Sequence, residues 1–213
     1  MSKIKIGQIG ICHEHASGKI DSVRKLPDIF EVVGVVDDRS TTAAKYAGSN
    51  LKPYEGLRWL SEDELLNYPG LQAVLVEVPN TDLVPVAMRC MERGLAMHMD
   101  KPGGEDLALF GKLVAEIEMQ RFMQTLSILV MNHVDIIKTV RIAVKVIQNQ
   151  VIRESFSALE GRLKGGEKLS AGLSGNEFIP AGTASKVRVG EESGYVGEML
   201  ARVDYLEVEP EPW

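Results

Sequence analysis

The first 120 residues alternate short apolar runs with segments in which apolar residues recur every three or four positions. The apolar runs cover Ile4–Ile11, Phe30–Val36, Leu71–Val78 and Leu95–Met99. Short runs rich in β-branched residues are typical of strands that are buried on both faces of a sheet. Strands that alternate with helices form parallel βαβ units with right-handed crossovers. We therefore predict an α/β fold with a doubly wound parallel sheet in the first half of the chain.

The segments between these runs predict helices, at about residues 20–26, 41–46, 84–91 and 107–117. Ser61 followed by Glu64 has the spacing of a capping box and predicts the start of a further helix. Asn80 or Thr81 is the expected N-cap of the helix that ends before Gly94.

Beyond residue 120 the pattern is weaker. Phe122–Val130 predicts a sixth strand, and the spacing of apolar residues over 137–147 predicts a helix. Ser155–Leu163 predicts the start of a second sheet. We therefore expect a smaller, incomplete α+β part after the parallel sheet.

Composition narrows the class of protein. Apolar residues make up 45% and charged residues 25% of the 213 residues, as in an ordinary globular protein. No apolar run approaches the roughly 20 residues needed to cross a bilayer, and no signal peptide is predicted. The net charge of −6 argues against a nucleic-acid partner. Two cysteines, Cys12 and Cys90, fit a reducing compartment, so we expect a cytoplasmic protein without membrane contact.

The glycine-rich segment 7–18 follows the first predicted strand. A dinucleotide fingerprint needs a tight turn and a close backbone approach to the pyrophosphate. Gly10 stands at the first glycine position, but Cys12 and His15 stand at the second and third, so a plain strand-to-helix turn is the alternative. His13 and His15 can donate to a phosphate, or they are polar surface residues. A metal site built from Cys12 and both histidines is too crowded, so no metal is predicted.

Two acids, Asp37 and Asp38, follow the second strand. A carboxylate there can accept hydrogen bonds from an adenosine ribose, whereas the alternative is an exposed turn with Asp38 as a helix N-cap. A carboxylate also repels a ribose 2′-phosphate, by roughly 1–4 kcal/mol for charges about 4 Å apart. We therefore expect the cofactor to be NAD rather than NADP.

Polar residues also follow the strands predicted at Leu71–Val78 and Leu95–Met99, at the end of the sheet where parallel strands bind ligands. They are Pro79 and Asn80 after one strand, and Asp100, Lys101 and Pro102 after the other. A lysine at this edge can donate to a substrate hydroxyl or to a cofactor ribose. The alternative for Lys101 is an ordinary solvated surface lysine.

The motifs VVGVVDD, AVLVEVPN and MERGLAMHMDKPGGEDL occur in an order that resembles the amino-terminal domain of the Gfo/Idh/MocA oxidoreductases. This family includes glucose–fructose oxidoreductase and inositol dehydrogenase, and the resemblance covers about residues 3–120. It implies a Rossmann-type domain and NAD(P)-dependent hydride transfer at a carbinol carbon of a sugar, inositol or related polyol. We therefore expect a small-molecule partner, the sugar or polyol substrate. Whether the chain forms a homo-oligomer stays open.

The resemblance assigns roles to individual residues. The family's Glu-Lys-Pro motif falls on Asp100, Lys101 and Pro102, which makes Lys101 the expected catalytic residue and Pro102 an expected cis-proline. Asp37 matches the family's ribose-binding acid. Pro79 and Asn80 match the loop that packs near the cofactor. Two residues depart from the family: Asp100 is one methylene shorter than glutamate, and Cys12 replaces a glycine, which should lower the affinity for pyrophosphate.

The second half departs further. The family's second domain supplies an Asp and a His that work beside the lysine, but no histidine follows His133, and only Gly165-Gly166 resembles the family's pattern there. We predict a dinucleotide-binding domain at 1–125 and an abbreviated or diverged substrate or oligomerisation domain at 126–213. Three interpretations stay open: an oxidoreductase, a cofactor-binding protein without turnover, and a structural subunit.

Overall fold

The chain divides into two compact units, Met1–Leu113 and Val114–Trp213, which we describe separately. The computed structural model describes residues 2–38, 51–180 and 182–203. The predicted boundary after residue 125 and the boundary between the units after Leu113 both fall inside one helix, α4 (Leu107–Met131). The predicted helix at 41–46 lies outside the described residues.

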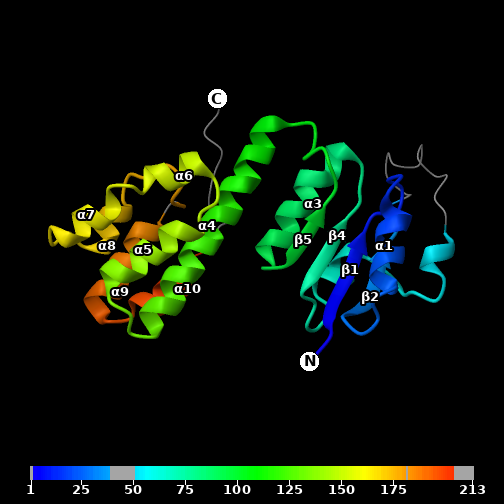
Figure 1. The fold of residues 1–213 in the computed structure, drawn as a ribbon, viewed down its shortest axis with the longest axis horizontal. Helices are drawn as coiled ribbons and strands as arrows, with labels where there is room; N and C mark the ends of the chain where they lie inside the picture. Colours follow the sequence, from blue (N-terminus) through cyan, green and yellow to red (C-terminus); the bar gives the residue numbers. More distant parts are fainter. Residues whose placement is uncertain (1, 39–50, 181, 204–213) are drawn as a thin grey trace. The chain divides into compact units, whose positions relative to one another are not determined.

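The first unit contains a five-stranded parallel sheet with the order β3-β2-β1-β4-β5 (Figure 1). Its elements are β1 (Ile4–Ile9), α1 (Ala16–Arg24), β2 (Phe30–Val36), the 3-10 helix η2 (Lys52–Tyr54), β3 (Trp59–Leu60), α2 (Glu62–Leu66), β4 (Ala73–Val76), α3 (Asn80–Glu92) and β5 (Ala96–Met99). This order confirms the predicted doubly wound sheet of Rossmann type. The strand β3, which has only two residues, was not predicted.

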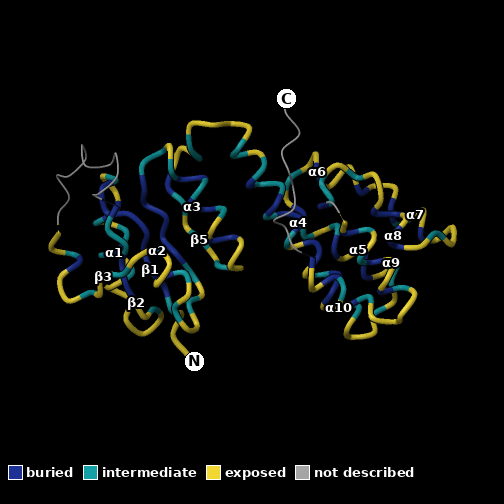
Figure 2. Tube along the Cα trace, turned by 180° about the vertical axis from the view of Figure 1, so that it is seen from behind, coloured by how far each residue is buried: buried dark blue, intermediate teal, exposed yellow. Residues whose placement is uncertain are grey.

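Apolar clusters on both faces of the sheet hold the first unit together. One face packs Ile9 and Val74 against Leu83 of α3, and the other packs Val35 against Ile20 of α1. The central strands are buried along most of their length (Figure 2). Burial on both faces explains why these strands read as continuous apolar runs in the sequence.

The helix ends follow the local sequence. Ser61 and Glu64 form the predicted capping box, in which each side chain accepts a hydrogen bond from the other residue's backbone N–H. The prediction for α3 was off by one residue, because Pro79 is the N-cap and Asn80 already belongs to the helix.

The described part of the second unit contains helices only. They are the rest of α4, α5 (Ile136–Val146), α6 (Gln150–Ser155), α7 (Leu159–Lys164), α8 (Leu169–Leu173), α9 (Thr183–Ser193) and α10 (Val196–Ala201). The predicted helix over 137–147 is confirmed. The predicted sixth strand at Phe122–Val130 is wrong, because α4 contains it, and α6 and α7 occupy most of the segment 155–163 that was predicted to begin a second sheet.

The spacing of the buried residues explains the helix at 122–130. Met119, Phe122, Met123 and Leu126 are buried, and they recur at intervals of three and four. Ile128 would share a strand face with Phe122 and Leu126, yet it is 56% exposed. The apolar run here therefore contains one buried helical face and one apolar residue on the exposed face. Among the described helices, none combines the length and apolar character that a membrane span requires.

We expect Phe122→Ala to lower the free energy of unfolding of the second unit by about 3–5 kcal/mol, because the ring is fully buried and lies 4.7 Å from the Phe156 ring. Ile128→Ala is the matched control on the same helix and should change it by no more than about 0.5 kcal/mol. Denaturant unfolding followed by far-UV circular dichroism measures both. Equal losses for the two variants would contradict this helical packing.

Candidate functional site

The strand order reverses between β1 and β4. The chain adds β2 and β3 on one side of β1 and then crosses to add β4 and β5 on the other side. Ligands of doubly wound folds bind at such a switch point, outside the carboxyl ends of the strands. Gly10 follows β1 there with φ +93°, and a Cβ on it would lie 2.5 Å from the backbone oxygen of Glu77. Only glycine fits this turn, as its place in the fingerprint predicted.

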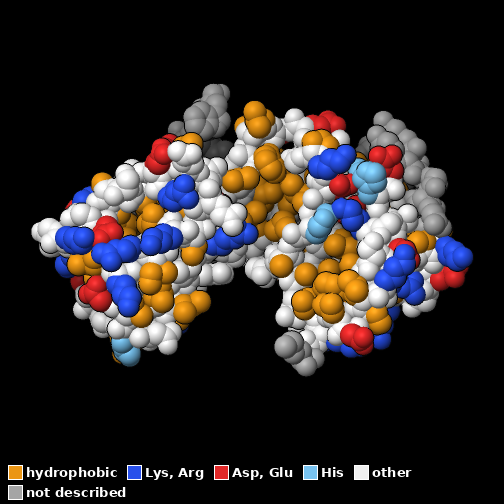
Figure 3. Space-filling model, in the orientation of Figure 1, with side chains coloured by type: hydrophobic (Ala, Val, Ile, Leu, Met, Phe, Trp, Pro, Cys, Tyr) orange, Lys and Arg blue, Asp and Glu red, His pale blue; other side chains and the backbone are white. Residues whose placement is uncertain are grey.

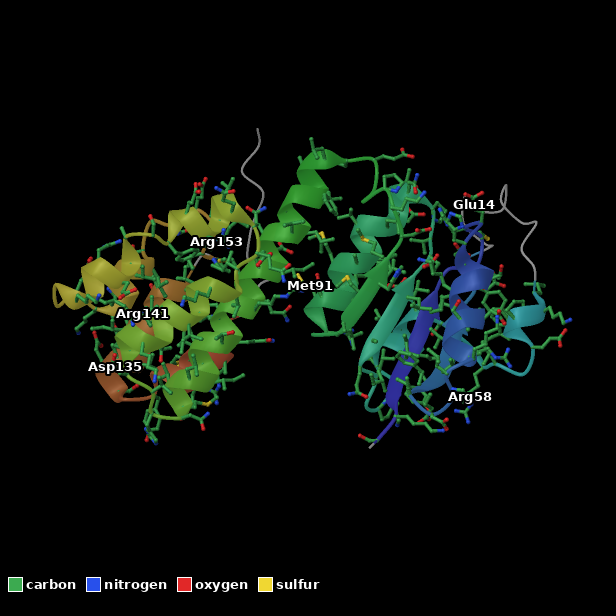
Figure 4. The ribbon with its side chains drawn as sticks, in the orientation of Figure 1. Glu14, Arg58, Met91, Asp135, Arg141 and Arg153 are labelled. Atoms are coloured by element: carbon green, nitrogen blue, oxygen red, sulfur yellow. The ribbon has the colours of Figure 1, made fainter. Side chains whose placement is uncertain are left out.

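The loop between β1 and α1 separates its side chains by environment. Cys12 is buried in the apolar cluster with Ile20 and Tyr54, so its thiol lies in the core of the first unit. His13 is partly buried, whereas Glu14, labelled in Figure 4, and His15 are exposed. The prediction that Cys12 lowers affinity for pyrophosphate stays a prediction.

His15 is the N-cap of α1, and its side chain makes no capping hydrogen bond. The first turn of a helix presents backbone N–H groups and the positive end of the helix dipole, which together favour an anion. The start of α1 thus fits a pyrophosphate, as the fingerprint requires.

The two acids after β2 differ in their surroundings. Asp38 is buried, and its Oδ1 accepts a hydrogen bond of 2.9 Å from the backbone N–H of Ile11. Asp38 is therefore not exposed, as the alternative assumed, and the helix that it would cap lies outside the described residues. Asp37 is partly buried and directly follows the strand. Asp38 stabilises the loop after β1, and Asp37 remains the acid predicted to bind ribose.

Sequence reasoning missed Glu77, which directly follows β4. Its side chain is fully buried, and both carboxylate oxygens lack a hydrogen-bond partner among the described residues. The nearest basic groups to Oε1 are Lys19 Nζ at 4.0 Å and His98 Nδ1 at 3.9 Å. Burial raises the pKa of Glu77 to about 7, although Lys19 opposes the rise. The sequence signal that could have identified Glu77 is its position as the only acid in the apolar run at 71–78.

Asp100 pairs with His13 at the end of β5. Its Oδ2 lies 2.8 Å from His13 Nδ1, and its Oδ1 accepts a hydrogen bond from the backbone N–H of Lys101. Burial alone would raise the pKa of Asp100, but the Lys101 N–H and the positive charges of His13 and Lys19 outweigh it and lower that pKa. Asp100 is therefore a buried carboxylate, and its interactions favour the charged form.

The predicted catalytic residue lies beside this cluster. The Lys101–Pro102 peptide bond is cis, as the resemblance implied, and both side chains are exposed. A lysine becomes an effective base when burial removes water from its ammonium group. Lys101 is exposed to solvent and is not in such an environment.

The loop before α3 completes this edge of the sheet. Pro79 and Asn80 are partly buried, and Asn80 Oδ1 accepts no hydrogen bond from the described residues. Figure 3 shows histidine, lysine and acidic side chains gathered together on one face of the first unit. The residues predicted to bind the cofactor thus follow β1, β2, β4 and β5, at the end of the sheet where the carboxyl ends of these parallel strands lie. They offer hydrogen-bond donors for phosphates and acceptors for hydroxyl groups.

The second unit has its own charged surface. Arg141 of α5, labelled in Figure 4, lies 2.6 Å from Glu160 of α7, and Lys164 pairs with the same carboxylate. These ion pairs are exposed, so each contributes at most about 1 kcal/mol. Gly165 and Gly166 end α7, and His133 occupies an exposed turn after α4 with φ 58°.

Comparison with known proteins gives a family match in the second half of the chain and several curated relatives. The family described as type II secretion system (T2SS), protein F, matches residues 122–204. Protein F of Xanthomonas campestris pv. campestris is 32% identical over 102 residues, 47% of this chain and 25% of that protein. Protein F of Pseudomonas aeruginosa is 32% identical over 94 residues, 44% of this chain and 23% of that protein.

The type IV pilus assembly protein PilC of Thermus thermophilus is 31% identical over 105 residues, 48% of this chain and 26% of that protein. The chain spans about a quarter of the length of these relatives. They differ from the relatives that the resemblance implied for residues 3–120.

Among solved structures, a mutant of KijD10, a 3-ketoreductase from Actinomadura kijaniata in complex with TDP-benzene and NADP, is similar with a TM-score of 0.42. It is 21% identical and covers 54% of this chain and 35% of that chain. The assignment of the first unit to the Rossmann type rests on its own strand order.

Proposed function

We propose that the first unit binds a nicotinamide dinucleotide. The observation that carries this proposal is the turn at Gly10 followed by α1, whose N-terminus has no side-chain cap, at the switch point of the sheet. Pyrophosphate would be held by the N–H groups of that loop and first helical turn. His13 and His15 lie in the same loop and can donate to it.

The two ends of the cofactor would then lie on either side of this loop. Asp37 would accept hydrogen bonds from the adenosine ribose and favour NAD over NADP. Pro79, Asn80 and Asp100 would lie near the nicotinamide end. When bound, the nicotinamide supplies a hydride acceptor.

We expect Asp37→Ala to weaken NADH binding about 10-fold, because a charged hydrogen-bond acceptor is worth roughly 1.5–3 kcal/mol and water replaces part of it. The same variant should bring the affinities for NADH and NADPH closer together. Fluorescence titration of the full chain with each cofactor, in the presence of EDTA, measures both effects.

Asp28→Ala is the matched control for this titration. Asp28 is exposed and precedes the amino end of β2, whereas Asp37 follows its carboxyl end. It should leave both affinities unchanged. An unmodified protein that binds neither cofactor would overturn the proposal, and equal affinity for both would remove the role of Asp37.

We further propose that the bound cofactor accepts a hydride from a sugar, inositol or related polyol, with Lys101 as the acid–base residue. Two features support this: Lys101 follows β5 at the cofactor edge, and it stands in a segment that resembles the family's Glu-Lys-Pro motif. The exposure of Lys101 and the helical second unit favour the competing interpretation, a cofactor-binding chain without turnover.

Lys101→Met should lower the rate of NAD reduction more than about 100-fold with any polyol that the unmodified protein oxidises. The variant keeps much of the side-chain bulk and removes the ammonium group. Absorbance of NADH over a panel of sugars and polyols measures the rate, with the exposed Lys25→Met as control. A protein that binds NADH but oxidises none of the panel would establish the competing interpretation.

A second candidate function concerns the helical unit. We propose that residues 122–204 perform the role that the matching segment has in protein F and PilC, as part of a secretion or pilus assembly. The observation that favours it is identity above 30% to three such proteins over about 100 residues each.

Exchange of segments tests this role. Residues 122–204 should restore type II secretion when they replace the matching segment of protein F in a Xanthomonas campestris strain that lacks the intact protein. The same exchange carrying Phe122→Ala should fail, since the segment loses a core ring. An exchanged protein that accumulates to normal levels without restoring secretion would contradict the proposal.

A further inference from the structure

Three potential metal ligands converge beside the switch point from three different segments. His13 comes from the loop after β1, Glu77 from the end of β4 and Asp100 from the end of β5. One ligand atom from each lies within 4.8 Å of the others. Glu77 and Asp100 are buried, and His13 is partly buried. The cluster is therefore built by the fold and is not a chance group of surface acids.

The second observation is that the Glu77 carboxylate has lone pairs without hydrogen-bond donors. Glu77 is fully buried, and neither of its oxygens accepts a hydrogen bond from the described residues. Asp100 Oδ2 is also buried, and its ion-pair partner, His13 Nδ1 at 2.8 Å, is itself a member of the cluster. Buried polar atoms in native proteins are nearly always satisfied, so the two oxygens of Glu77 need a partner.

We propose that His13, Glu77 and Asp100 bind a divalent first-row transition cation such as Zn²⁺. One imidazole and two carboxylates form a ligand set that Zn²⁺ accepts, and three protein ligands leave a fourth position open. Tetrahedral bonds of about 2.1 Å place ligand atoms about 3.4 Å apart. His13 Nδ1 and Asp100 Oδ2 are 2.8 Å apart, which is below that value, and no two of the three ligand atoms lie more than 4.8 Å apart, so metal binding requires the side chains to shift.

The surroundings of the cluster suit a cation. Glu77 and Asp100 carry two negative charges when ionised, and Lys19 offers one positive charge, 4.0 Å from Glu77 Oε1. Lys19 Nζ also lies 3.3 Å from His98 Nε2 and so is shared between two groups. The side chain of His13 is 18% exposed, so one of the three proposed ligands is in contact with solvent. The prediction of no metal considered only Cys12, His13 and His15; the new set takes one residue from that loop.

Calorimetric titration of the chelator-treated full chain with ZnCl₂ tests the site. We expect one Zn²⁺ per chain, with affinity lowered at least about 100-fold by Glu77→Gln and by His13→Gln. Glu31→Gln and His133→Gln are matched controls on exposed residues and should leave the affinity unchanged. Zn²⁺ should raise the midpoint temperature of thermal unfolding of the unmodified protein and of both controls, but not that of the ligand variants.

Asp100→Asn provides a third ligand variant if one of the others does not fold, and it should weaken binding by a similar factor. The site would be overturned by the absence of stoichiometric binding, or by an affinity that folded ligand variants share with the controls. The metal titration uses no nucleotide, and the NADH titration uses EDTA. Failure of one proposal is therefore distinguishable from failure of the other.

Discussion

The candidate site depends on the close approach between Gly10 and the backbone of Glu77. Gly10 has no Cβ, so the chain after β1 can turn directly over the end of β4. A Cβ at this position would overlap the Glu77 carbonyl. This turn places Cys12 in the core and brings His13 to Asp100. Asp38 fixes the same loop from the other side by accepting the Ile11 N–H. A single backbone contact thus determines which side chains of the loop face the core and which face the ligand edge.

The sequence was informative wherever burial on both faces produced a continuous apolar strand. That pattern predicted the segments of β1, β2 and β4, and an apolar run also predicted β5, none of whose residues is buried. The ends of those strands indicated where polar residues would gather. It did not reveal Glu77, because periodicity records polarity and not the partners of a buried acid. It also failed at Phe122–Val130, where a continuous apolar run is compatible with either a strand or a buried helix. There, packing against residues far along the chain selected the helix.

The two halves of the chain point to different relatives. The motifs within residues 3–120 led to the expectation of an oxidoreductase domain, whereas residues 122–204 match the family of protein F. The change falls within α4, a continuous helix from Leu107 to Met131. The second domain of the resembled family supplies an acid–base histidine, whereas His133, in a turn after α4, is the last histidine in this sequence. Dinucleotide binding and assembly are thus separate proposals that rest on separate units.

The position of β5 at the end of the sheet has a consequence for solubility. Among the described strands, β5 pairs only with β4, so the N–H and C=O groups along its other side form an edge. Such an edge can template pairing with strands of other molecules, which leads to aggregation. The strand is only four residues long, which leaves few groups for such pairing. Its brevity therefore helps to keep the parallel sheet from growing beyond one molecule.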